Sequence, residues 1–79
     1  MDNKLHKLGK ILYWIYTLRS ESLDAETYSR YCDKIYEALL DIAPQYKPKQ
    51  IDPYFLDIIV QTNRRLRNEW LLLWIKIHR

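Results

Sequence analysis

Residues 53–78, PYFLDIIVQTNRRLRNEWLLLWIKIH, decide the fold because they form the longest helical pattern in the chain. Asp52 and Pro53 are typical of a helix start, with an N-cap residue before a proline at the first helical position. Apolar residues then recur at helical spacing on one predicted core face, which comprises Phe55, Ile59, Leu66, Trp70, Leu73 and Ile77. We therefore predict a helix over residues 53–78, about 39 Å long.

The same period occurs twice upstream of this segment. Residues 4–20 predict an amphipathic helix whose polar side includes Tyr13 and Thr17, and whose apolar face comprises Leu5, Leu8, Ile11, Leu12, Ile15 and Leu18. Residues 24–43 predict a second helix, with Asp24 as its N-cap and Pro44 after its end. Its apolar arc comprises Tyr28, Tyr31, Cys32, Ile35, Tyr36, Leu39, Ile42 and Ala43. With residues 44–52 as a proline-containing loop, residues 1–79 are predicted to form one all-α domain, a small three-helix bundle with a long C-terminal helix.

Composition excludes several classes of protein. The chain has 79 residues, 48% of them hydrophobic and 29% charged, which are globular values rather than those of a disordered chain. Its single cysteine, Cys32, cannot form an internal disulfide, and with only His6 and His78 besides it gives too few ligands for structural zinc. We expect a reduced, cytoplasmic protein with no metal and no cofactor, in which Cys32 is a core thiol.

Neither a membrane span nor a cleaved leader is expected. The longest uninterrupted apolar run, Trp70 to Ile75, is far shorter than the roughly 20 residues that span a bilayer. The lysine-rich start resembles a signal peptide only superficially, because no small-residue cleavage site follows its apolar stretch.

The carboxylates do not suggest catalysis. General acid–base chemistry needs a titratable group held in a pocket, whereas the largest group of acidic residues, four of the ten, falls on the predicted solvated arc of residues 24–43. We therefore expect a protein that is not an enzyme and has no small-molecule substrate.

The segment WLLLWIKI, residues 70–77, is apolar around almost the whole helix circumference. A helix with this pattern must be covered on every side. With short loops and an up-down-up order, this end is predicted to lie beside the turn between the first two helices and to protrude by roughly 10 Å. A protruding apolar end favours pairing with a second copy, so we predict a homodimer.

Aromatic residues make up 14% of the chain, and Tyr and Trp are enriched where proteins bind each other. Large side chains filling a small core would explain the same composition. We favour a regulator, adaptor or inhibitor that binds a larger protein partner. The predicted interface comprises Trp70, Leu72, Trp74, Ile75, Ile77, Tyr13 and Trp14.

A basic cluster favours an alternative function. Arg64, Arg65 and Arg67 stand in the one polar stretch of the longest helix, and Lys47 and Lys49 lie in the preceding loop. Arginine clamps phosphates and reads guanine edges, so a dimeric nucleic-acid-binding regulator is the second hypothesis. The interpretation without a nucleic-acid ligand is that the arginines form a solvated face of the helix, with Glu69 placed to pair with Arg65.

Overall fold

The structure, a computed structural model, describes residues 3–49 and 55–78. Within these residues the fold is all-α, with three helices and no strand: α1 (Asn3–Ser20), α2 (Ala25–Ile42) and α3 (Phe55–Ile77). One short 3₁₀ helix, η1 (Pro44–Tyr46), follows α2 in the segment predicted as a loop. The predicted start of the third helix at Asp52 and Pro53 lies outside the described residues.

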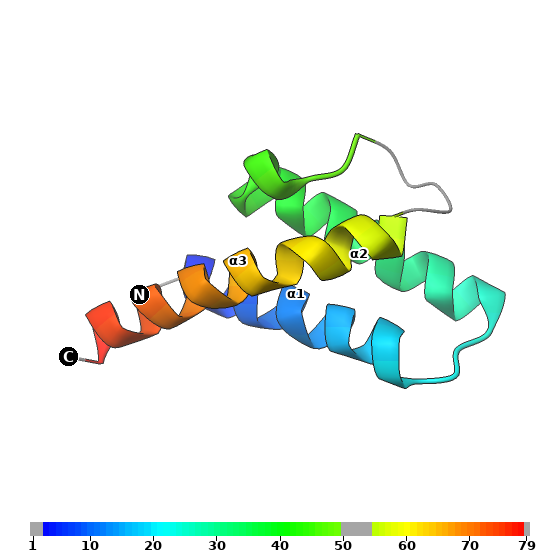
Figure 1. Ribbon diagram of the computed structural model, residues 1–79, viewed down its shortest axis with the longest axis horizontal. Coiled ribbons are helices and arrows are strands. Elements are labelled where there is room, and N and C mark those ends of the chain that lie inside the picture. The colour runs from blue at the N-terminus through cyan, green and yellow to red at the C-terminus, as the bar shows by residue number, and fades with distance from the viewer. Residues whose placement is uncertain (1–2, 50–54, 79) are drawn as a thin grey trace.

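α1 is the central helix and runs antiparallel to both of its neighbours (Figure 1). Near the start of α1, Lys7 pairs with Asp41 at the end of α2, and Gly9 lies against Trp70 near the end of α3. At the other end of α1, Leu18 and Leu56 line one groove. α2 and α3 therefore both end beside the start of α1.

This direction corrects the up-down-up prediction, which placed the end of α3 beside the turn between α1 and α2. The prediction assumed a short connection, but residues 43–54 separate α2 from α3. A connection of that length can reach roughly 40 Å when extended, which is more than the length of α2. The chain therefore returns along the bundle before α3 begins.

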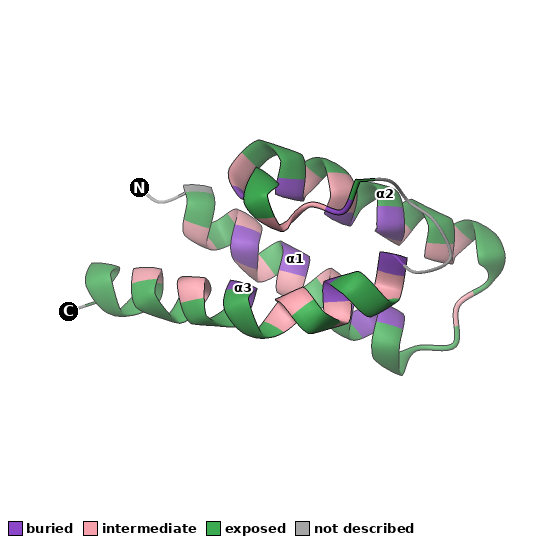
Figure 2. Cartoon of the chain, turned by 45° about the horizontal axis from the view of Figure 1, so that its top comes forward, coloured by how far each residue is buried: buried purple, intermediate pink, exposed green. Residues whose placement is uncertain are grey.

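The core collects where the three helices meet (Figure 2). Its buried apolar residues are Leu8, Ile11, Ile15 and Leu18 of α1, Cys32, Ile35 and Leu39 of α2 with Ala43 after it, and Phe55, Ile59 and Leu66 of α3. The predicted apolar arcs of the first two helices are confirmed, since every member is buried or half-buried. The arc of the third is wrong at Ile77, which is 46% exposed because α3 outruns its neighbours there.

Thr17 also departs from the prediction, because it is buried although it was assigned to the polar side of α1. Its hydroxyl donates a hydrogen bond to the Tyr13 carbonyl oxygen at 3.0 Å, within the same helix. The side chain can therefore be buried without leaving its hydroxyl unpaired.

Local interactions define α2. The carboxylate of Asp24 accepts a hydrogen bond from the Thr27 backbone N–H at 2.7 Å, which confirms Asp24 as the N-cap. One turn further, Arg30 donates to Glu26 at 2.8 Å, four residues apart as expected for a helical ion pair.

Side chains tie the segment after α2 back to the bundle. The Tyr46 hydroxyl donates to Glu69 on α3 at 3.0 Å, and Lys47 Nζ donates to the Tyr36 hydroxyl on α2 at 3.0 Å. The Tyr36 hydroxyl in turn donates to the Lys49 carbonyl oxygen at 3.2 Å. These bonds hold the first part of the connection against both α2 and α3.

Candidate interaction surface

The last two turns of α3 carry a cluster of exposed apolar side chains, here called the terminal patch. Its members are Leu71, Leu72, Trp74, Ile75 and Ile77, which are 45%, 69%, 42%, 51% and 46% exposed. Single exposed apolar residues are ordinary on protein surfaces, but a contiguous group of this size typically marks a contact site. The predicted interface residues Leu72, Trp74, Ile75 and Ile77 all belong to it.

The patch is exposed because α1 and α3 differ in length. α3 has 23 residues and α1 has 18, a difference of roughly 8 Å at 1.5 Å per residue. Leu66 is the last fully buried residue of α3, and beyond it the helix is half-buried or exposed (Figure 2). Too little of the rest of the chain lies around the final turns to cover their whole circumference.

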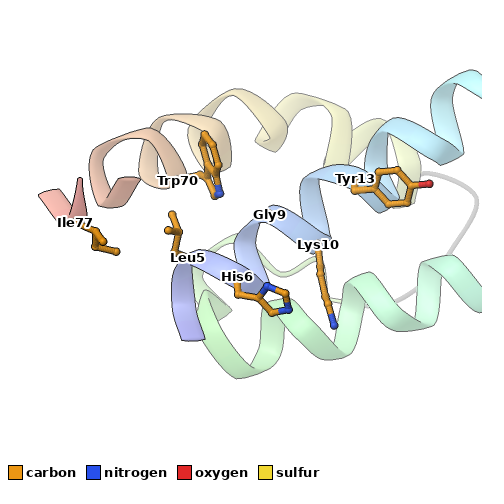
Figure 3. Close-up of a pocket in the computed structure, with 7 residues that line it drawn as sticks. All are labelled: Leu5, His6, Gly9, Lys10, Tyr13, Trp70 and Ile77. Atoms are coloured by element: carbon orange, nitrogen blue, oxygen red, sulfur yellow. The ribbon is translucent and has the colours of Figure 1, made fainter. Parts of the chain in front are cut away.

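Beside the terminal patch, α1 and α3 enclose an open groove of about 550 Å³, here called the Gly9 groove. Gly9 forms its floor, with Trp70, Leu5 and Ile77 along one edge, His6 and Lys10 along the other, and Tyr13 at one end (Figure 3). A Cβ built on Gly9 would lie 3.3 Å from Trp70 Nε1, so the absent side chain lets the indole approach the α1 backbone.

Trp70 and Tyr13, both predicted interface residues, therefore line this groove, but Trp14 does not. Trp14 is half-buried, packs against the core and has Lys34 Nζ at 5.9 Å from its ring centroid. It lies in the furrow between α1 and α2 with Lys7, Lys10 and Asp41. The predicted interface thus divides into the residues around the end of α3 and one residue on a different seam.

The sequence did not indicate that Leu5, His6, Gly9 and Lys10 would lie beside Trp70 and Ile77. The two groups are at least 60 positions apart in the chain. Periodicity within one helix carries no information on whether two helices run parallel or antiparallel. The one local signal was Gly9, the only glycine of the chain, within a helical pattern.

The basic cluster is only partly assembled. Arg64, Arg65 and Arg67 are exposed on α3, and no ion pair involves them within the described residues. Lys47 is half-buried and donates a hydrogen bond to the Tyr36 hydroxyl, whereas Lys49 is exposed. Glu69 accepts from Tyr46 instead of pairing with Arg65. At about 100° per residue, the arginines thus point in different directions around α3, and Lys47 contributes little to a shared basic surface.

The titratable groups of the described residues include the Cys32 thiol and two histidine imidazoles. Burial raises the pKa of the Cys32 thiol, which keeps it protonated and confirms it as a packed core residue. His6 and His78 are both exposed, and His78 stacks on Trp74 with ring centroids 4.4 Å apart. In the described part of the chain, no three His, Cys, Asp or Glu side chains are grouped to hold a metal ion, and no helix is long and apolar enough to cross a membrane.

Comparisons with known proteins add nothing to this geometry: no family model, no curated protein and no solved structure matches the chain.

Proposed function

We propose that this chain is a non-enzymatic protein-interaction module, a regulator, adaptor or inhibitor that acts by covering a surface of a larger protein. The observation that carries the proposal is the terminal patch, five large apolar side chains that are all exposed within residues 71–77 at the end of α3. Burying one such side chain is worth roughly 1.5–3 kcal/mol, so leaving five of them in water is costly.

We further propose that the free chain pairs as a homodimer through the outer side of this patch. At about 100° per residue, Leu72 and Ile75 share the side of α3 opposite Leu66, its last buried core residue. Two-fold pairing would use the same residues twice and bury both copies.

The test of the proposed function is a comparison of the intact chain with a Leu72→Glu, Ile75→Lys variant. The immobilised intact chain first captures a protein from a cell extract at about 0.5 M salt, where surface charges are screened. That protein is then purified, and its direct binding to each chain is measured. We expect the variant to lose that binding while its helical circular dichroism is unchanged. Leu40→Glu is the matched control, because Leu40 is 55% exposed on α2, away from the patch. Equal binding by all three chains would contradict the proposal.

The three exposed, unpaired arginines of α3 favour a second candidate, binding of nucleic acid by a dimer. If that is the function, replacing Arg64, Arg65 and Arg67 with alanine should weaken duplex binding. It should also flatten the salt dependence of the binding, because a protein that makes fewer phosphate contacts releases fewer counterions from the duplex. Duplex binding at about 150 mM salt that the triple variant does not change would remove these residues from the candidate.

A further inference from the structure

We propose that the Gly9 groove binds an acidic amphipathic helix of a partner protein. This inference rests on the proposed interaction function and names the chemistry of the partner. It uses a different surface from the outer side of the terminal patch, so the two can be tested separately.

The two edges of the groove differ in chemistry. Trp70, Leu5 and Ile77 form an apolar edge, whereas the cationic Lys10 and the imidazole of His6 form a polar edge across the α1 backbone (Figure 3). Among the described residues, no carboxylate lines the groove. A helix lying over Gly9 would therefore place apolar side chains on one side and acidic side chains on the other, which is the pattern of an amphipathic helix.

The positive charge of Lys10 at this edge has no ion-pair partner among the described residues. In the adjoining furrow between α1 and α2, Lys7, Lys10 and Lys34 face the carboxylates of Glu37 and Asp41. Asp41 is paired with Lys7, and no ion pair involves Lys10 in the described residues. One cation is therefore in excess where the furrow meets the groove, and a carboxylate from a partner would match it.

Two features favour a helix over an extended peptide. Within the described residues there is no strand edge to which a peptide strand could add, whereas α1 and α3 present a seam between antiparallel helices. At the centre of that seam the Trp70 indole packs where Gly9 has no side chain, and this flat aromatic surface can carry the apolar side of a helix. The Trp70 indole N–H faces the same point and donates no hydrogen bond within the described part of the chain.

A second copy of the chain fits this groove poorly. α1 carries Lys4, Lys7, Lys10 and Arg19 and no acidic residue, so crossing α1 with itself would bring like charges together. The exposed arc of α2 is acidic but offers only Leu40 as an exposed large apolar residue.

The experiment uses the full chain and two synthetic amphipathic helical peptides, identical except that the glutamates of one are lysines in the other. Fluorescence anisotropy should show the acidic peptide binding at least tenfold more tightly, with an affinity that falls as salt rises. Lys10→Glu should weaken that binding about tenfold, and Gly9→Leu should abolish it. Lys49→Glu, the same charge change on the loop, should leave it unchanged.

Equal affinity for both peptides, or no binding at about 200 µM, would overturn the proposal. The proposal would also be overturned if both groove variants still bound the acidic peptide. Binding of anionic phosphatidylserine vesicles in place of the peptide would overturn it, and so would self-association of the chain that Gly9→Leu abolishes. Circular dichroism confirms that each variant is folded. Loss of peptide binding in the Leu72→Glu, Ile75→Lys variant would also count against a separate groove site. If the acidic peptide does not bind but the patch variant still loses binding to the captured protein, only the groove proposal is contradicted. If the peptide does not bind and the patch variant keeps its binding to the captured protein, the proposed function is contradicted as well.

Discussion

Asp24 shows how a single side chain defines the start of a helix. Its carboxylate accepts the Thr27 N–H, and these hydrogen bonds from Thr27 lower the pKa of the Asp24 carboxyl below its usual value of 3.8. The ionised form therefore favours the folded chain. Its contribution to stability is complete above the unfolded pKa near 3.8 and is lost as the pH falls through the lower folded value.

We predict that Asp24→Ala lowers the melting temperature at neutral pH by several degrees, because the cap is lost. Asp24→Asn should retain most of the stability, since asparagine also caps but does not titrate. In acid titrations followed by circular dichroism, the gap between the chain and the Asp24→Ala variant should close below about pH 3.8. A gap that is independent of pH would show that the charge of Asp24 plays no part.

At Gly9, a side chain that would stabilise the helix would also crowd the Trp70 indole in the Gly9 groove. An alanine there would suit the helix better but would place its Cβ 3.3 Å from Trp70 Nε1. Trp70 borders open grooves on two sides of Gly9, so its indole has space to shift by a few tenths of an ångström.

We therefore predict that Gly9→Ala raises the free energy of unfolding by about 0.5–1 kcal/mol in urea titrations, and that Trp fluorescence reports the shifted indole. A loss of stability would show instead that Trp70 is held in its place and cannot yield to the added methyl group.

At the scale of the element, α3 has two halves that obey different rules. Its first half buries Phe55, Ile59 and Leu66 in the core, whereas its last turns carry the exposed terminal patch. Leu66→Ala should therefore cost about 2–5 kcal/mol of stability, as expected for a fully buried leucine. Leu71→Ala, on the exposed half, should cost less than about 1 kcal/mol when it is measured on the monomer, at a concentration too low for pairing. Similar losses at both positions in urea unfolding of the monomer would mean that the rest of the chain covers the patch.

Tyr46 and Glu69 join η1 to α3, and the sequence predicted neither the contact nor the 3₁₀ turn. The hydrogen bond to the Glu69 carboxylate raises the pKa of the Tyr46 phenol above its usual value of 10. This bond contributes to stability below pH 10 and is lost as the pH rises through the higher folded pKa. Burial also raises the pKa of the Tyr28 phenol, so ultraviolet titration should show more than one late-ionising tyrosine, and Glu69→Gln should return only Tyr46 toward the others.

Local rules predicted the elements well and their assembly less well. The apolar arcs and bounds of α1 and α2, and the N-cap of α2, follow from residues at most four apart, such as Asp24 with Thr27 and Glu26 with Arg30. The direction of α3 depends on how the long connection returns, which periodicity does not encode. The Gly9 groove is formed by residues from both ends of the chain, so it could not be predicted from the sequence. The exposure of Trp74, at the nearby end of α3, could be predicted.

At the scale of the whole molecule, the homodimer is the prediction with the clearest readout. Sedimentation velocity of the intact chain at tens of micromolar should give the mass of two copies, and Trp74→Glu, Ile75→Lys should give a folded monomer. An intact chain that is monomeric at that concentration would contradict pairing through the terminal patch.

The antiparallel return of α3 also has a consequence for the order in which the molecule assembles. Contacts between α1 and α2 join nearby parts of the chain, such as Trp14 and Lys34, whereas Gly9 and Trp70 close a far longer loop. Because longer loops cost more entropy to close, the α1–α2 hairpin is expected to form early and the end of α3 to dock late. On the ribosome, the Gly9 groove cannot exist until Trp70 and Ile77 have emerged, so a partner that reads this groove would recognise only chains whose synthesis has reached that point.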